Sequence, residues 1–325
     1  NGSGMYIYNQ GTLSLEGIKN EIEYLANMQR AANFSHTTGF VYITGNVVGQ
    51  WGDGHPKHLV DGVTGEWDGI DNPPTKLGGN IDTTGDTYVI FKTLNRENPF
   101  FYTLMTGGDT YSYQDRNTGS WDIYGATFAG DAEATKTAEG WELVDSKKNI
   151  GKDRMLPQNL TRSYFGFSSE TTTPYQYYKI VFWGNFKGQS GAVQLQELEF
   201  GTTEQFDSIK TVYIDAAKEF DTNKTAYKPY IERYESLLED SIDQCVNMEV
   251  LYRINKQLET LRDTINASEE AYTRYMDLVA ENQDFLNENN NPSAGGYKEY
   301  NDYLNERVEP NEIYPNGSYD YIMEE

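Results

Sequence analysis

The sequence predicts a multidomain chain in which an antiparallel β-sandwich is followed by an α-helical bundle. Before Gly201, short runs of strand-forming residues alternate with clusters of Gly, Pro, Asn and Asp, a pattern typical of antiparallel sandwiches. After Gly201, apolar residues recur every three or four positions, which is the period of an amphipathic helix. A chain of 325 residues is long enough for two domains.

These changes of pattern divide the chain into three regions. An apolar stripe from Leu15 to Leu25 predicts one amphipathic helix, over 15–31, ahead of the sandwich. The regions are 1–34, the leading segment with this helix; 35–202, the sandwich; and 203–325, an acidic helical region with an irregular tail.

The sandwich region is expected to contain many short strands rich in aromatic and β-branched residues. Gly45–Pro56 and Gly69–Gly85 are expected to be loops, because Gly and Pro gather there. Strands are expected at 41–44, 87–91, 100–105, 121–124, 141–145, 175–183 and 193–200.

The helical region begins with a capping box, in which Thr202 and Gln205 can satisfy each other's backbone N–H groups. The second and third helices fit either one long helix or a hairpin broken near Asn247. Ser268 is expected to cap the last helix. The stripes predict helices over 206–220, 231–245, 251–265 and 268–286.

Several motifs occur in an order and spacing that resemble a known family. They are HLVDGVTGEWDG (58–69), RNTGSWDIYG (116–125), WELVD (141–145), YQYYKIVFW (175–183) and LQELEFG (195–201). Together they resemble the discoidin domain, also called the coagulation factor V/VIII type C domain, and in particular carbohydrate-binding module family 32. The resemblance covers about residues 35 to 202. It implies a jelly-roll, galactose-binding-like sandwich that serves as a binding module.

The charge of the chain argues against some partners. The net charge is −24, and residues 1–34, 35–202 and 203–325 carry −1, −7 and −16 of it. So acidic a chain is repelled by nucleic acid and by anionic lipid, so neither is expected as a partner. No apolar run reaches 18 residues, so no membrane insertion is expected.

Signatures of catalysis are missing from the sequence. It has three histidines and one cysteine, and it contains no zinc-protease, phosphate-loop, dinucleotide or nucleophile-elbow motif. Cys245 lies on an apolar helix stripe and is expected to be a core thiol. We therefore expect a protein without enzymatic activity.

Loops at one end of the sandwich carry the candidate ligand-binding residues. A sugar ring needs an aromatic face to stack on and polar groups for its hydroxyls. Trp51 is the leading candidate, since a large aromatic among glycines is difficult to bury, although burial under the end of the sandwich remains an equal alternative. The full candidate set is Trp51, His55, Tyr113, Arg116 and Phe186.

One structural calcium ion is the metal that the resemblance implies. In modules of this family it is held between the Asp-Gly loop and a Glu of the last strand, and here Asp61 and Glu197 match those positions. Val63 replaces a second family Asp, and the expected substitute ligand is Thr64 or a backbone carbonyl. Hard oxygen ligands of this kind suit calcium.

The function expected from the sequence is therefore glycan binding by a module of an exported, multi-modular bacterial protein. The expected location is extracellular, on the cell surface or periplasmic, and the abrupt start at Asn1 suggests a piece of a longer chain. The alternative is a protein-interaction or adhesion module, with the helical bundle as the partner-binding element or a spacer. A third alternative is a purely structural role.

Overall fold

The structure is a computed structural model of the whole chain, and it forms two compact units, Asn1–Asp207 and Ser208–Glu325. It describes residues 39–52, 54–63, 76–94, 98–168, 174–223 and 228–306. The helix expected over 15–31, the irregular tail after 306 and the metal candidate Thr64 lie outside the described residues.

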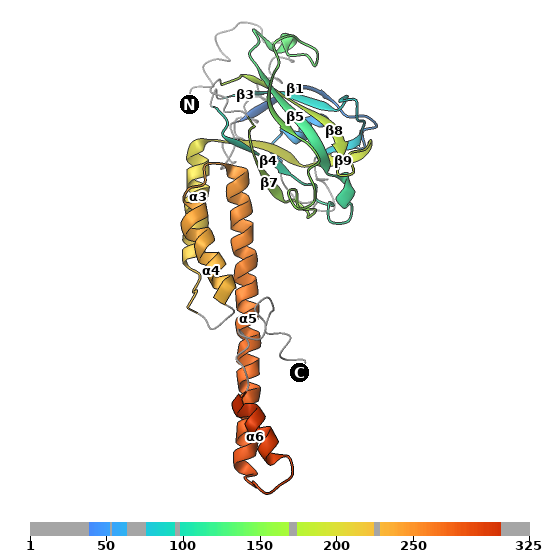
Figure 1. Cartoon of the computed structure of the whole chain (residues 1–325). Coiled ribbons are helices and arrows are strands. Elements are labelled where there is room, and N and C mark those ends of the chain that lie inside the picture. The colour runs from blue at the N-terminus through green and yellow to red at the C-terminus, as the bar shows by residue number, and fades with distance from the viewer. Residues whose placement is uncertain are drawn as a thin grey trace, which may run out of the picture. The chain divides into compact units, whose positions relative to one another are not determined.

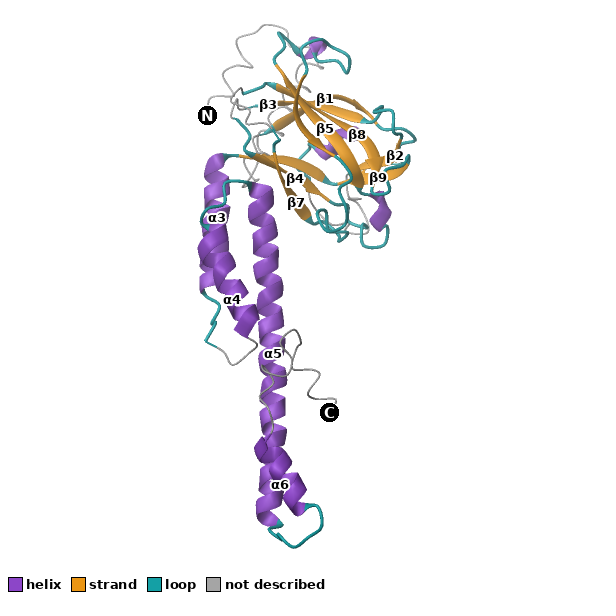
Figure 2. Ribbon diagram, in the orientation of Figure 1, coloured by secondary structure: helices purple, strands orange, loops and turns teal. Residues whose placement is uncertain are grey.

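The first unit is an antiparallel β-sandwich, as predicted (Figures 1 and 2). The larger sheet has five strands in the order β1-β3-β8-β5-β6, and a three-stranded sheet has the order β10-β4-β7. A two-stranded sheet pairs β2 with β9. The strands are β1 (Phe40–Asn46), β2 (Leu77–Ile81), β3 (Tyr88–Thr93), β4 (Phe101–Met105), β5 (Thr118–Ala126), β6 (Glu142–Lys147), β7 (Arg162–Gly166), β8 (Tyr177–Asn185), β9 (Gly191–Leu195) and β10 (Glu197–Gly201).

The core lies between the sheets and is built from large aromatic side chains. Phe91 and Trp121 come from the five-stranded sheet, and Tyr102, Phe165 and Phe200 come from the three-stranded sheet. All five are at most 1% exposed. Edge-to-face and stacked contacts join them, such as the 5.0 Å edge contact between the rings of Trp121 and Phe165.

Two predicted features of the sandwich are wrong. The single strand expected at 193–200 is two strands, because the chain changes sheets at Gln196, whose N–H donates to Met105 O at 2.8 Å. The loop expected at Gly69–Gly85 contains β2. The glycines of β2 let another loop approach closely, since a Cβ on Gly79 would lie 3.0 Å from Val48 O.

The helical region starts at α3 (Thr203–Lys218) with the predicted capping box. Thr202 N donates to Gln205 Oε1 at 2.7 Å, and Gln205 N donates to Thr202 Oγ1 at 3.3 Å. The later elements are α4 (Lys228–Ser236), the π-helical turn η4 (Leu237–Ile242), α5 (Met248–Glu288) and α6 (Tyr297–Glu306).

The hairpin alternative near Asn247 is confirmed, whereas the helix boundary at Ser268 is wrong. Asn247 caps α5, because its Oδ1 accepts hydrogen bonds from the N–H groups of Glu249 and Val250. Ser268 is fully buried in the interior of α5, which continues unbroken for 41 residues. Its length is therefore about 60 Å. None of the described helices is apolar over a membrane-spanning length.

Candidate functional site

The cation of Arg116 brings together three of the five candidate ligand-binding residues. The short helix η2 (Gln114–Arg116) follows Tyr113 and carries Arg116 at its end. The guanidinium carbon of Arg116 lies 3.6 Å from the centroid of the Tyr113 ring and 4.9 Å from that of Trp51. Both distances are within the range of cation–π attraction. We call Trp51, Tyr113 and Arg116 the aromatic–arginine cluster.

Backbone hydrogen bonds to Gly54 and Gly78 fix the position of Trp51. Trp51 N donates to Gly78 O at 3.3 Å, and Gly78 N donates to Gly54 O at 3.0 Å. A Cβ on Gly78 would lie 3.3 Å from the Trp51 ring, so the glycine lets this half-buried ring pack against β2. The ring therefore contacts β2 and Arg116, and Trp51 supports the cluster more than it presents a free face.

Tyr113, which contacts Arg116, and Tyr111, two positions before it, are the exposed aromatic residues of this loop. Their exposed fractions are 47% and 68%. Turns hold the loop that carries them, with Tyr113 N donating to Thr110 O and Arg116 N donating to Tyr113 O, both at 3.0 Å. Tyr111 N also donates to Asn159 Oδ1 at 2.7 Å. Tyr113 belongs to the predicted candidate set, and its exposure depends on this loop.

Two carboxylates near the cluster are each shared by two cations. Asp109 accepts from Lys76 Nζ at 2.7 Å, and its other oxygen lies 3.8 Å from Arg116. Lys76 is fixed further by Gln194, 2.9 Å away on β9. Because Lys76 takes the short contact, Asp109 neutralises only part of the charge of Arg116.

Asp115, next to Arg116 in η2, has the same arrangement. Lys187 Nζ lies 2.8 Å from one oxygen of Asp115, and Lys152 Nζ lies 3.6 Å from the other. The hydrogen bond from Lys187 is the main reason that the pKa of Asp115 is lowered. The carboxylate is therefore ionised at neutral pH and is matched by two ammonium groups.

His55 and Phe186 lie outside the cluster. The Nδ1 atom of His55 accepts from Lys57 N at 3.0 Å, and its ring contacts Tyr42 and His58. Burial, with the charges of Lys57 and His58, lowers the pKa of His55. The Phe186 side chain packs against the core of the sandwich. Neither the His55 ring nor the Phe186 ring is part of the surface formed by Tyr113 and Arg116.

The two described calcium candidates lie close together. Glu197 is 2% exposed, and its Oε2 has no hydrogen-bond partner. Burial raises the pKa of Glu197 well above its usual range, the charges of Asp61 and Glu199 raise it further, and the N–H of Gly62 opposes them. The Asp-Gly loop therefore abuts the last strand, as the family resemblance implies.

The fit to a cation is partial. The Asp61 oxygens are used by His58 Nδ1 at 2.6 Å and by Val63 N at 3.0 Å. Within the described ranges, no three His, Cys, Asp or Glu side chains converge as a metal site. Asp61 and Glu197 can supply carboxylate oxygens, and the buried, unpartnered Oε2 is the observation that suits an added cation.

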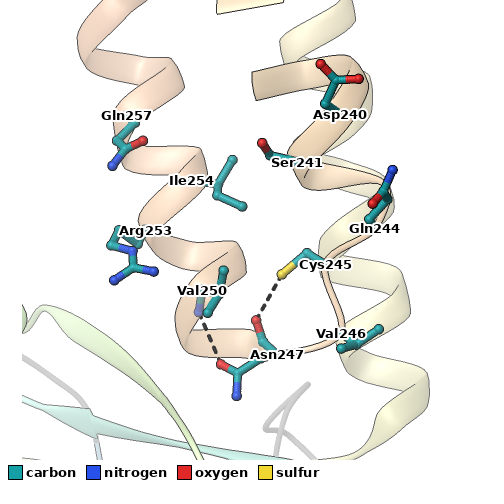
Figure 3. A pocket seen from close by; sticks show the side chains of 10 residues that line it. All are labelled: Asp240, Ser241, Gln244, Cys245, Val246, Asn247, Val250, Arg253, Ile254 and Gln257. Atoms are coloured by element: carbon teal, nitrogen blue, oxygen red, sulfur yellow. Dashed lines mark hydrogen bonds between the residues drawn. The ribbon is translucent and has the colours of Figure 1, made fainter. Parts of the chain in front are cut away.

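The helical unit has a groove of its own between the end of η4 and the start of α5 (Figure 3). Its volume is about 660 Å³, and Cys245 Sγ donates to Asn247 O at 3.2 Å beside it. Cys245 is 6% exposed, in agreement with the expected core thiol. The side chains around the groove are mostly amides and aliphatic groups, so they offer no nucleophile with an activating base.

No family model and no curated protein sequence matches the chain. Solved structures do match it. A SusE-like protein is 13% identical with a TM-score of 0.38, covering 50% of this chain and 96% of that one. A family 32 carbohydrate-binding module from a family 31 glycoside hydrolase of Clostridium perfringens is 13% identical with a TM-score of 0.32, covering 52% and 99%.

The N-terminal domain of the single-strand break repair protein XRCC1 also matches, with 10% identity and a TM-score of 0.33, covering 52% of this chain and 100% of that domain. Family 32 modules are thus among the structures similar to this chain, in line with the sequence motifs. At these identities, the ligands of those proteins do not carry over to this chain.

Proposed function

We propose that the sandwich is a carbohydrate-binding module, and that the aromatic–arginine cluster with Tyr111 is its ligand-binding surface. The observation that carries the proposal is the stacking of Arg116 on Tyr113, 3.6 Å from the ring centroid, next to a tyrosine that is 68% exposed. The apolar face of a sugar ring can stack on an exposed aromatic ring such as that of Tyr111. The guanidinium offers hydrogen-bond donors for hydroxyl oxygens at the edge of that ring.

The architecture favours binding over catalysis. The cluster contains no nucleophile paired with a base, and it lies on loops that the sandwich holds in place. An exported, multi-modular bacterial protein, in which such a module tethers the whole to polysaccharide or host glycans, is the setting that we propose. The support for that setting is compositional, since the chain is rich in Tyr and Gly and has one cysteine.

A glycan array followed by calorimetry tests the proposal. The wild type is compared with Tyr113→Ala and Trp51→Ala. Tyr303→Ala is the matched control, because Tyr303 is 67% exposed on α6, in the other unit. We expect loss of glycan binding in Tyr113→Ala, weaker binding in Trp51→Ala, and no change in the control. Thermal melts verify that each variant is folded. A folded wild type that binds no glycan on the array would refute the proposal.

We also propose that one calcium ion, held by Asp61 and Glu197, stabilises the sandwich. A bound divalent cation would compensate two neighbouring carboxylates and would join the Asp-Gly loop to β10. Backbone oxygens of the same loop are the further ligands that this requires.

An interaction with a protein is the second candidate function, and it has its own observation. Leu278, Phe285 and Tyr303 are 43%, 58% and 67% exposed on α5 and α6. Leu278 and Phe285 are seven positions apart, which places them on the same helix face. Surface plasmon resonance with cell-envelope extracts, comparing wild type with Phe285→Ser, tests this candidate, and equal binding by both proteins would argue against it.

A further inference from the structure

We propose that the glycan bound at the aromatic–arginine cluster is anionic and carries a carboxylate or a sulfate beside the stacked ring. This inference rests on the proposed glycan-binding function and specifies its substrate class. It follows from the charges that surround η2, which differ in sign from the charge of the chain as a whole.

Among the residues that the structure describes, the ion pairs at η2 carry a net positive charge in a strongly negative chain. Four cations and two carboxylates gather at η2, since Asp109 is shared by Lys76 and Arg116, and Asp115 is shared by Lys152 and Lys187. Each group of three keeps one uncompensated positive charge. The net charge of the whole chain is −24. A positive patch of this kind attracts an anionic ligand, although most of the chain repels one.

The guanidinium is also prepared geometrically for an anion. Its guanidinium carbon lies 3.6 Å from the Tyr113 centroid and 4.9 Å from that of Trp51, so two aromatic rings position the group. The contact to Asp109, at 3.8 Å, is longer than a hydrogen bond. Carboxylate and sulfate oxygens match the planar fork of donors, whereas a neutral hydroxyl uses only one of them.

The neighbouring parts fit the rest of such a ligand. Tyr111, 68% exposed, provides a second aromatic surface for an adjoining sugar. Lys152 and Lys187, whose side chains are 48% and 59% exposed, pair with Asp115, next to Arg116 in the chain. A chain of charged sugars would contact more than one of these cations, so affinity should increase with the number of charged residues in the oligosaccharide.

The test uses four probes in two matched pairs. Oligogalacturonate is compared with its methyl ester, and sulfated lactose is compared with lactose. Within each pair the ring is the same and only the charge differs. Calorimetry at low and high salt is done on the wild type and on Arg116→Gln, Arg116→Lys and the double variant Lys152→Gln/Lys187→Gln.

Lys136→Gln is the matched control, because Lys136 is a sandwich lysine paired with the exposed Asp86 and has no contact to η2. We expect the charged member of at least one pair to bind about tenfold more tightly than its neutral partner, the difference of one charge-assisted hydrogen bond. Arg116→Gln should remove that preference, Arg116→Lys should retain part of it, and the control should retain all of it. High salt should reduce it.

The outcomes distinguish a failure of the anionic preference from a failure of glycan binding itself. Preference for the uronate pair identifies a carboxylated sugar, and preference for the sulfate pair identifies a sulfated one. Equal binding of charged and neutral partners, unaffected by salt or by the double lysine variant, would overturn the anionic class and leave glycan binding intact. Failure to bind any probe or array glycan would instead refute the proposed function. The double variant keeps the test valid if Arg116→Gln does not fold, because its two lysines are exposed.

Discussion

The hydroxyl of Tyr102 donates to Asp145 Oδ2 at 2.6 Å and thereby joins the two large sheets across the core. Tyr102 lies on β4 and Asp145 on β6, and both are at most 1% exposed. The same hydroxyl accepts from Trp121 Nε1 at 2.8 Å. Lys147 Nζ, 2.9 Å from the other Asp145 oxygen, compensates the buried charge. The polar groups of this network are therefore satisfied by one another.

Tyr102→Phe should be destabilising without changing the shape of the core. The substitution leaves one oxygen of Asp145 and the Trp121 N–H without a partner, which costs about 1–3 kcal/mol. Urea denaturation followed by tryptophan fluorescence measures the effect. Tyr303→Phe, which changes an exposed tyrosine, is the control and should have no effect. Equal stability of the two variants would mean that the network contributes nothing.

Gly201→Ala should be more damaging than its size suggests. A Cβ on Gly201 would overlap the ring of Phe101, which is fully buried on β4 and cannot move away. Overpacking of this kind costs typically about 1–3 kcal/mol. Gly130→Ala is the matched control, because a Cβ there meets nothing within 4 Å. A thermal melt should show a lower Tm for Gly201→Ala alone, and equal Tm values would contradict the close contact between Gly201 and Phe101.

The order of strands and helices could largely be predicted from the sequence, because local period and composition determine it. The break between β9 and β10 could not: the apolar positions change phase at Gln196, from 193 and 195 to 198 and 200, but such a shift does not distinguish a β-bulge from two strands. A tertiary hydrogen bond to Met105 O, together with the change of sheet, creates it. The cap predicted at Ser268 is wrong for a related reason, because burial holds a residue with cap preference inside α5.

The candidate site was predictable as a set of residue types and not as an arrangement. Trp51, Tyr113 and Arg116 come from two loops separated by more than sixty positions, and no local pattern indicates that the guanidinium contacts both rings. The sequence left Trp51 as either an open platform or a buried ring, and in the structure the half-buried ring packs against β2 and lies 4.9 Å from the Arg116 guanidinium. Exposure of Tyr113 likewise follows from the turn that begins at Thr110.

Calcium should raise the Tm of the wild type and not that of Glu197→Gln. If Asp61 and Glu197 hold the ion, calcium at one hundred times its Kd adds about 2.7 kcal/mol to the free energy of unfolding, or about 5–10 °C in Tm. Differential scanning calorimetry with calcium and with chelator measures this. Glu139→Gln, which changes an exposed glutamate, is the control and should respond like the wild type. A Tm that ignores calcium would exclude a stabilising ion.

Lys179 should lose its proton before the other lysines. It is 7% exposed on β8, and burial is the main reason that its pKa falls to about 8, with the charge of Lys136 adding to the effect. The rings of Trp141 and Tyr124, 4.6 Å and 4.7 Å from Nζ, favour the charged form but do not outweigh the loss of water. Carbon-13 NMR of the lysine side chains should show a titration midpoint near 8.

The lowered pKa of Lys179 also predicts how stability depends on pH. Between pH 8 and the ordinary lysine value of 10.5, the unfolded chain binds more protons at this position than the folded chain, so the free energy of unfolding rises with pH in that window. Below pH 8 both states are protonated, and the buried ammonium lowers stability by a constant amount. The wild type should therefore gain stability relative to Lys179→Met between pH 8 and 10, measured by urea denaturation.

Lys298, whose pKa is raised by its hydrogen bond to Asp302, provides the internal reference in the NMR titration. If Lys179 and Lys298 titrate together, Nζ of Lys179 remains hydrated, and the pH-dependent difference in stability should be absent as well.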